Sequence, residues 1–268
     1  MTPTSKNKAL SAWVSTAGQS KLRFMLPEEF VKTVVTSYEN NRGVFSNKVN
    51  AEDLIPEGLS DQNRALFLFY VIQLDYATKS QNLYRGANEL YRLNPSFFTT
   101  VYQKETSQES VTDLLKKYLR PRYLNEAIRR YQINTDRLLK NYSGKPLKIF
   151  KESKTALEAL EKVRTFRGFG PKIGNFFVRT MVNTFSFDYP DIQEILPPVD
   201  VHDVRIAYLM GYVPSKEMTT RNIQTVKELW SKACKKAKVS WLTFDKALWL
   251  LGSEGRPQSK NDVLKLIS

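Results

Sequence analysis

Residues 166–175, Phe-Arg-Gly-Phe-Gly-Pro-Lys-Ile-Gly-Asn, join two stretches of the chain in which apolar residues recur every three or four positions. These stretches, residues 153–166 and 171–185, are therefore predicted to be helices. The two glycines between them tolerate a positive φ, and the proline suits the first position of a helix because no backbone N–H is needed there. The sequence thus predicts two helices joined by a tight hairpin.

The hairpin is also expected to bind an anion. The backbone N–H groups of such a turn and the dipole of the helix that follows both favour a phosphate. We expect Gly168 and Gly170 to hold a DNA backbone without reading its sequence, because phosphate contacts carry no base information. The alternative is a plain connection between helices, since Gly-x-Gly alone is a weak signal.

Outward from the hairpin, the same apolar spacing predicts an all-α fold. The first 55 residues have a weaker pattern, which leaves room for short strands near the N-terminus, and prolines at 188–198 indicate a crossing between two lobes. We expect a cleft between one lobe at residues 56–186, which ends in the hairpin, and a second lobe formed by residues 1–55 and 187–268. Further helices are predicted at residues 27–38, 60–79, 82–93, 107–119, 123–142, 200–211, 219–237, 243–252 and 260–267.

The charge of the chain points to a polyanionic partner. Lys and Arg number 41 against 27 Asp and Glu, which gives a formal net charge of +14. Nucleic acid is the first candidate and an anionic membrane surface the second, while a solvated basic surface without a role is the remaining reading. No stretch approaches the roughly 20 apolar residues of a membrane span, and the first residues show no apolar core of a signal peptide. We therefore expect DNA as the partner and no membrane.

Single cysteine and histidine residues narrow the chemistry. Cys234 alone cannot supply an iron–sulfur cluster or a zinc-thiolate site, and His202 alone cannot supply a histidine metal centre. No metal site is expected from these side chains. Catalysis would then depend on Lys, Asp, Glu, Tyr, Ser or the backbone.

Lys172 and Asp200 are the candidate catalytic residues. A lysine in the first turn of a helix opposes the helix dipole, whose field favours the neutral, nucleophilic amine. Asp200 is predicted to be an N-cap, with Asp203 as its capping-box partner, and an ionised carboxylate fixed in this way can stabilise an oxocarbenium-like transition state. The alternatives are a solvated or phosphate-binding lysine and a purely structural cap. His202 could orient Asp200, bind a phosphate or be structural.

The segment 166–175, followed by Pro-Val-Asp-Val-His at 198–202, resembles the helix–hairpin–helix DNA glycosylase superfamily. The amino-acid sequence of the second segment is most similar to that of the 8-oxoguanine glycosylases. Residues 244–252 are similar to the closing helix of their archaeal branches. The resemblance spans residues 61–252 loosely, and upstream it places residues 66–83 and 123–127 among the helices of the family's barrel. Where eukaryotic 8-oxoguanine enzymes have a cysteine four residues after the lysine, this chain has Phe176.

The resemblance implies a base excision repair glycosylase with lyase activity on abasic sites, and 8-oxoguanine is the favoured substrate. Lys172 would attack C1′ and form a Schiff base, and Asp200 would assist. The enzyme would need no cofactor and carry no iron–sulfur cluster, although a monovalent cation could sit on the hairpin carbonyls. It would act as a monomer on damaged double-stranded DNA, inside the cell at the nucleoid or nucleus. Residues implied to bind the DNA backbone are Gly168, Gly170, Lys172 and His202.

The damaged base must be flipped into a pocket before it is removed. Aromatic residues suited to stacking on it are Phe176, Trp241, Phe244 and Trp249, although each taken singly is more simply explained by core packing. Gln73 and Asn82 are guessed to face the duplex. Two other functions remain open, namely a non-catalytic helix–hairpin–helix DNA-binding module and a monofunctional glycosylase in which Asp200 activates water.

Overall fold

The computed structural model describes residues 25–268, and every regular element in this part of the chain is helical. The all-α prediction is therefore confirmed for these residues. The α-helices are α1 (Pro27–Glu39), α2 (Asp61–Ile72), α3 (Ser80–Leu93), α4 (Thr100–Glu105), α5 (Gln108–Leu114), α6 (Leu124–Tyr142), α7 (Pro146–Lys151), α8 (Ala156–Arg164), α9 (Ile173–Phe185), α10 (Val201–Leu209), α11 (Thr220–Ala237), α12 (Trp241–Ser253) and α13 (Lys260–Leu266). Short helical turns are η1 (Gly43–Phe45), η2 (Ala51–Leu54), η3 (Pro95–Phe98), η4 (Leu115–Leu119) and η5 (Ile192–Glu194).

The strands that the sequence left open near the N-terminus are not formed in residues 25–55. This part contains α1 and the turns η1 and η2 instead, and residues 1–24 lie outside the described part. The buried apolar residues of α1, Phe30, Val31, Val34 and Val35, recur at helical spacing, and Pro27 starts the helix. A strand would need alternation of apolar and polar residues, which this segment lacks.

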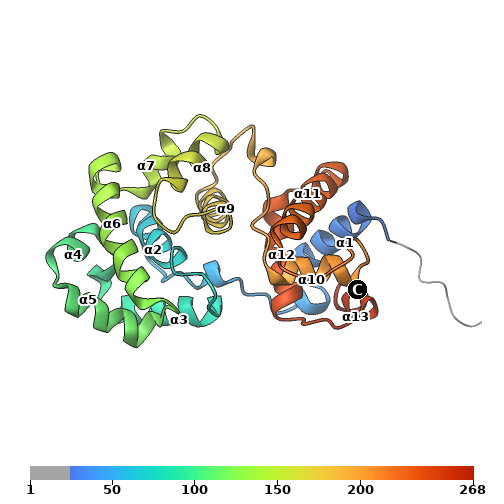
Figure 1. The fold of residues 1–268 in the computed structure, drawn as a ribbon, viewed down its shortest axis with the longest axis horizontal. Coiled ribbons are helices and arrows are strands. Elements are labelled where there is room, and N and C mark those ends of the chain that lie inside the picture. Colours follow the sequence, from blue (N-terminus) through green and yellow to red (C-terminus); the bar gives the residue numbers. More distant parts are fainter. Residues whose placement is uncertain (1–24) are drawn as a thin grey trace, which may run out of the picture.

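The helices lie in two groups (Figure 1). Helices α2 to α9 form one group, which we call the α2–α9 group. Helix α1 packs against α11 and α12 and so joins α10 to α13 in the second group, which we call the α1/α10–α13 group. The chain crosses between the groups twice, before α2 and after α9, as Figure 1 shows.

Helix α2 is the centre of the α2–α9 group. Every residue from Ala65 to Ile72 is buried, and α7 and α9 pack on this helix. Burial of each large apolar side chain in this run contributes about 1.5–3 kcal/mol to folding. Because the helix is buried on every side, it can carry apolar residues all round. Packing on α2 therefore holds α9, and with it the hairpin that precedes α9, in a fixed position.

Helix α2 ends earlier than the sequence predicted. Residues 60–79 were expected to form one helix, but α2 stops at Ile72 and α3 starts at Ser80. The loop between them contains Ala77 with φ of +54°, and the Ser80 hydroxyl donates to the Asp75 carboxylate. The left-handed backbone at Ala77 and the bond between Ser80 and Asp75 stabilise a loop at this point. The helix therefore ends at Ile72, although apolar residues continue at helical spacing in the sequence. Helices α4 and α7 were not predicted.

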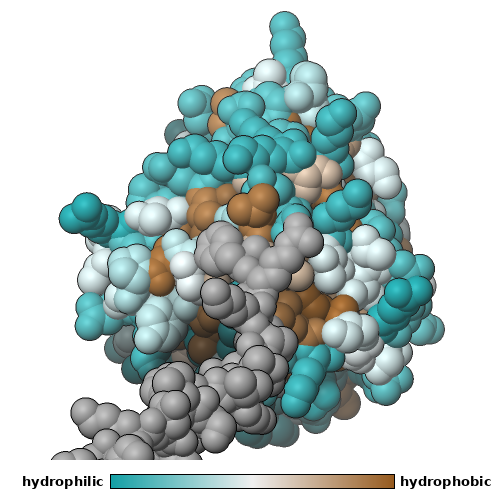
Figure 2. Space-filling view, turned by 90° about the vertical axis from the view of Figure 1, so that its right-hand side faces the viewer, coloured by the Kyte–Doolittle hydropathy of each residue, from teal (hydrophilic) through white to brown (hydrophobic). Residues whose placement is uncertain are grey.

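Aromatic side chains form the centre of the α1/α10–α13 group. The ring of Phe30 on α1 lies 5.7 Å from that of Trp230 on α11, and Trp230 in turn contacts Phe244 on α12. Polar side chains cover most of the outer end of this group, and apolar ones gather near its middle (Figure 2). Among the described helices, none has both the length and the apolar character needed to span a membrane.

Candidate active site

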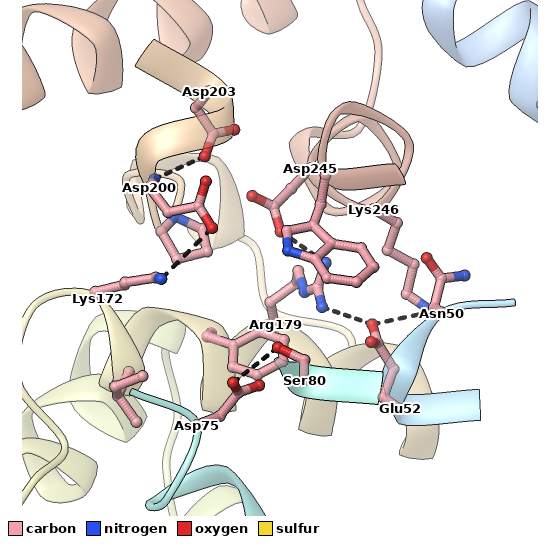
Figure 3. Close-up of a pocket in the computed structure, with 14 residues that line it drawn as sticks. Asn50, Glu52, Asp75, Ser80, Lys172, Arg179, Asp200, Asp203, Asp245 and Lys246 are labelled. Atoms are coloured by element: carbon pink, nitrogen blue, oxygen red, sulfur yellow. Dashed lines mark hydrogen bonds and ion pairs between the residues drawn. The ribbon is translucent and has the colours of Figure 1, made fainter. Parts of the chain in front are cut away.

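A pocket is lined by residues from both groups of helices (Figure 3). Charged and polar side chains dominate the lining, and two aromatic side chains complete it. They come from the segment that leads into η2, the loop after α2, and helices α3, α9, α10 and α12. The lining residues are Asn50, Glu52, Asp75, Ser80, Lys172, Ile173, Phe176, Arg179, Pro198, Asp200, Asp203, Asp245, Lys246 and Trp249.

The turn between α8 and α9, residues 165–172, is shaped by a glycine and a buried ring. Gly168 has φ of +88°, and a Cβ there would lie 2.7 Å from Nε of Arg130. Phe169 is buried, and its ring stacks on that of Phe69 in α2 with centroids 5.5 Å apart. The turn is therefore anchored on α2, while Gly170 stays exposed.

Asn134 on α6 holds the backbone of this turn. Its Nδ2 donates to the Arg167 carbonyl at 2.9 Å, and its Oδ1 accepts from the Arg167 N–H at 2.8 Å. Nδ2 also donates to Gln73 Oε1 at 2.9 Å, and both amide side chains are fully buried. The prediction that Gln73 faces the duplex is therefore wrong, because its amide orients Asn134 inside the protein.

Several backbone groups of the turn have no partner within the described residues. The N–H groups of Gly168, Gly170 and Lys172 donate to no protein acceptor. The carbonyls of Gly168 and Phe169 likewise accept no hydrogen bond from the described part of the chain. Such a turn can offer donors to an anion and carbonyl oxygens to a cation.

Lys172 lies immediately before α9, and its side chain extends into the pocket (Figure 3). Its Nζ is 3.5 Å from Oδ2 of Asp200, and the lysine side chain is 42% exposed. The two residues are 28 positions apart in the sequence, so only the fold joins them. The amine is thus reachable from outside while it faces a carboxylate.

Asp200 is the N-cap of α10, as predicted. Its Oδ1 accepts from the backbone N–H of His202 at 2.7 Å, and its own N–H donates to Oδ2 of Asp203 at 2.7 Å. Burial alone would raise the pKa of the Asp200 carboxyl, but Lys172, the Asp203 bond and His202 together hold that pKa below its ordinary value. The carboxylate is therefore ionised and fixed at neutral pH, with Oδ2 turned toward the amine.

Three other carboxyl groups of the pocket have the opposite shift. Burial, followed by the charges of Asp200 and Asp245, raises the pKa of Asp203 well above its ordinary value. Burial also raises the pKa of Asp75 and of Asp245 to about 6 each, against the lowering effects of Ser80 and Arg179 respectively. Asp200 is therefore the most acidic of these four carboxyls, and the other three hold their protons more readily.

A buried ionic network joins the two groups of helices at the pocket. Arg179 on α9 donates to Glu52 of η2 at 2.5 Å and to Asp245 on α12 at 2.6 Å. All three side chains are less than a tenth exposed, and Nε of Arg179 has no partner. The Arg179 guanidinium also lies over the ring of Phe176, 4.7 Å from its centroid. These contacts fix α9 and α12 relative to each other.

Two of the four aromatic candidates line the pocket. Phe176 on α9 and Trp249 on α12 are half-buried and belong to the lining. Trp241 and Phe244 do not, so their assignment to the pocket is corrected. Trp241 is buried and donates from its indole to the Ile192 carbonyl, and Phe244 is buried against α1 and α11. On α12 their positions face the core rather than α9.

Neither the His202 imidazole nor Asn82 lines the pocket. His202 is half-buried, and burial lowers the pKa of its imidazole. A Cβ at Gly252 would lie 2.5 Å from that of His202, so α12 passes very close to the start of α10. This packing favours the structural reading of His202. Asn82 is exposed on α3, which leaves its predicted contact with the duplex open.

Metal ligands do not gather anywhere in residues 25–268. No group of three or more His, Cys, Asp or Glu side chains there is arranged to hold a metal ion, and Cys234 is buried.

Four charged residues of the pocket were not predicted from the sequence, namely Asp75, Arg179, Glu52 and Asp245. Arg179 and Asp245 carried a signal, because each is a charged residue within an apolar stretch of a predicted helix. Asp75 and Glu52 had none, since Asp75 lies in a loop and Glu52 in the short turn η2, and the positions of both depend on tertiary contacts.

Comparison of the sequence with family models and curated proteins found no relative. The chain matches no protein-family model, and no curated protein is similar to it in sequence.

Proposed function

We propose that the protein is a DNA glycosylase with lyase activity on abasic sites, acting through Lys172 and Asp200. The observation that carries the proposal is the 3.5 Å separation of Lys172 Nζ and Asp200 Oδ2 at an open pocket. Removal of a base from deoxyribose needs a nucleophile for C1′ and a fixed negative charge for the oxocarbenium-like transition state. An exposed amine beside an ionised, capped carboxylate supplies both.

The proposed reaction begins with a base flipped into the pocket. Asp200, whose pKa is lowered, stabilises positive charge on the sugar as the bond to the base breaks. The Lys172 amine adds to C1′ and loses a proton, while the base leaves with the electrons of its bond to C1′ and takes up a proton. The C1′–O4′ bond then breaks with its electrons on O4′, which becomes a hydroxyl, and this leaves an imine between Nζ and C1′. Elimination of the 3′ phosphate from this imine would then cleave the strand.

The DNA backbone is proposed to lie on the turn between α8 and α9, which would serve as the helix–hairpin–helix motif. Unpartnered N–H groups of Gly168, Gly170 and Lys172 and the start of α9 suit a phosphate. The net charge of +14 supports a polyanionic partner. A monovalent cation on the carbonyls of Gly168 and Phe169, which the family resemblance implies, fits the same turn and would neutralise a phosphate there.

The flipped base is proposed to stack on Phe176 and Trp249, which line the pocket from α9 and α12. An oxidised purine such as 8-oxoguanine is the favoured substrate, because the pocket lining combines these two aromatic rings with many side chains that can form hydrogen bonds. Asp203, whose pKa is raised well above its ordinary value, would present a carboxyl group that can donate as well as accept.

Borohydride trapping tests the proposal. The protein is incubated with duplexes that contain a single 8-oxoguanine, thymine glycol, uracil or abasic site, and borohydride reduces any imine to a permanent protein–DNA bond. We expect a covalent band with one of the base lesions and with the abasic site. Lys172→Ala should abolish the band, whereas Lys232→Ala, on a side chain 75% exposed, should leave it unchanged.

Other outcomes select the remaining functions. A strand break that appears only after hot alkali, with no trapped band, would indicate a monofunctional glycosylase in which Asp200 activates water. DNA binding without a trapped band and without a strand break would indicate a non-catalytic DNA-binding module. In that case Lys172→Ala should still bind DNA.

A further inference from the structure

Asp75 lies on the opposite side of the pocket from Asp200, in the loop between α2 and α3 (Figure 3). Its side chain is 9% exposed. Oδ1 accepts a hydrogen bond from the Ser80 hydroxyl at 2.8 Å, whereas Oδ2 has no hydrogen-bond partner among the described residues. Unlike the orphaned atoms of Asn50 and Arg179, this oxygen is not sealed from solvent. One carboxylate oxygen is therefore held in place and the other remains free at the pocket.

The charges around Asp75 come from every element that faces it. Burial raises its pKa to about 6, Ser80 and Lys172 on α9 oppose this rise, and Glu52 of η2 and Asp200 of α10 add to it. The buried hydroxyl of Tyr84 on α3 also lies within its electrostatic range. At neutral pH the group is mostly ionised, yet it is a stronger base than an ordinary carboxylate.

We propose that Asp75 is the general base of the strand-cleavage step, which takes the C2′ proton from the imine that Lys172 forms with the abasic sugar. This inference rests on the proposed function. Oδ2 accepts the proton, the C2′–H electron pair forms a C1′=C2′ double bond, and the iminium electrons move to Nζ. The enamine pair then re-forms the C=N bond as C2′=C3′ forms, and the 3′ phosphate leaves with the C3′–O electrons. Water later hydrolyses the imine and frees Lys172.

Asp200 is poorly suited to the same step. The backbone N–H of His202 occupies one oxygen of its carboxylate, the Lys172 amine faces the other, and its lowered pKa makes it a weak base. Two carboxyls whose environments move their pKa values apart commonly divide the roles of charge stabiliser and proton acceptor. Here Asp200 stabilises the first step and Asp75 serves the second.

Asp75→Asn separates the two steps. Asparagine keeps an oxygen that can accept from Ser80 but cannot take a proton. On a duplex with a preformed abasic site, we expect the trapped adduct to persist or increase in yield. Strand cleavage should fall about 100-fold or more, the usual contribution of a general base. Base release from a lesion duplex should change little.

Ser80→Ala is the matched control, because it removes the hydrogen bond to Oδ1 and keeps the carboxylate. We expect it to retain most of the cleavage rate, and Asp75→Glu to restore part of it. Wild-type cleavage should rise with pH through about 6 and the Asp75→Asn rate should lack this rise. Equal losses in Asp75→Asn and Ser80→Ala would show a structural role for the loop and overturn the proposal.

The remaining outcomes keep this inference distinct from the function it rests on. If the wild-type protein forms no trapped adduct on any duplex, the proposed function itself fails. If the wild type is trapped and Asp75→Asn cleaves at the wild-type rate, the general base is another group and only the inference fails. Loss of both trapping and cleavage in a folded Asp75→Asn protein also overturns it, because Asp75 would then act before the imine.

Discussion

At the scale of single residues, Asp200 combines two roles that mutation can separate. Asparagine at position 200 could still accept from the His202 N–H and cap α10, so we expect its free energy of unfolding to stay within about 0.5 kcal/mol of wild type. Alanine would lose the cap and about 1 kcal/mol. Both variants should lose base release by about 100-fold or more, because the charge is gone. Urea unfolding and single-turnover excision measure the two effects.

The contrast between the variants is the informative result. Full activity in Asp200→Asn would show that the charge of Asp200 is not used, and the proposed stabilisation of the sugar would be wrong. Equal stability of the two variants would show that the cap contributes little.

Asp75 is predicted to cost the protein stability at high pH. Its pKa is about 6 in the folded protein against 3.8 for the free side chain. The resulting stabilisation is complete below the lower value and is lost as pH rises through about 6, where a buried group ionises. Asp75→Asn should therefore unfold with a free energy about 1–3 kcal/mol higher than wild type at pH 8. The difference should shrink at pH 5, and urea titrations at both values can check this.

At the scale of elements, the turn between α8 and α9 depends on one amide of α6. Asn134→Ala would leave the partly buried backbone N–H and carbonyl of Arg167 without their partners. Each unsatisfied group costs about 1–3 kcal/mol, so we expect a loss of about 2–4 kcal/mol in the free energy of unfolding. DNA affinity should fall as well, because the phosphate-binding turn loosens. Asn125→Ala, on an exposed position of the same helix, should change neither.

Elements were predictable from the sequence where a local signal decided them. Apolar spacing located most of the helices, and Asp200 was visible as a cap. The end of α2 was not predictable, because the bonds of Gln73 and Asp75 that stop it reach residues elsewhere in the fold or in the next helix. Likewise Lys172 and Asp200 stood out by their helix-end positions. Glu52, in the short turn η2, and Asp75, in a loop, became pocket residues only through tertiary structure.

At the scale of the whole molecule, the two groups of helices are joined by the buried ions of Arg179, Glu52 and Asp245. Arg179→Met would remove the cation shared by two buried carboxylates, and we expect a loss of about 3–5 kcal/mol in the free energy of unfolding at pH 7.5. At pH 5 the loss should be smaller, because Asp245, with a pKa of about 6, is then mostly protonated. Lys246→Met, which removes a cation 3.7 Å from Glu52, is the matched control and should cost much less.

The position of α1 has a consequence for how the chain folds on the ribosome. The α2–α9 group is continuous in sequence and can close as soon as it has been synthesised, whereas α1 packs on helices made much later. About 180 residues separate the end of α1 from the start of α11, which takes roughly 10–40 s to synthesise. During that time the apolar face of α1 has no native partner, which makes the nascent chain a client for chaperones.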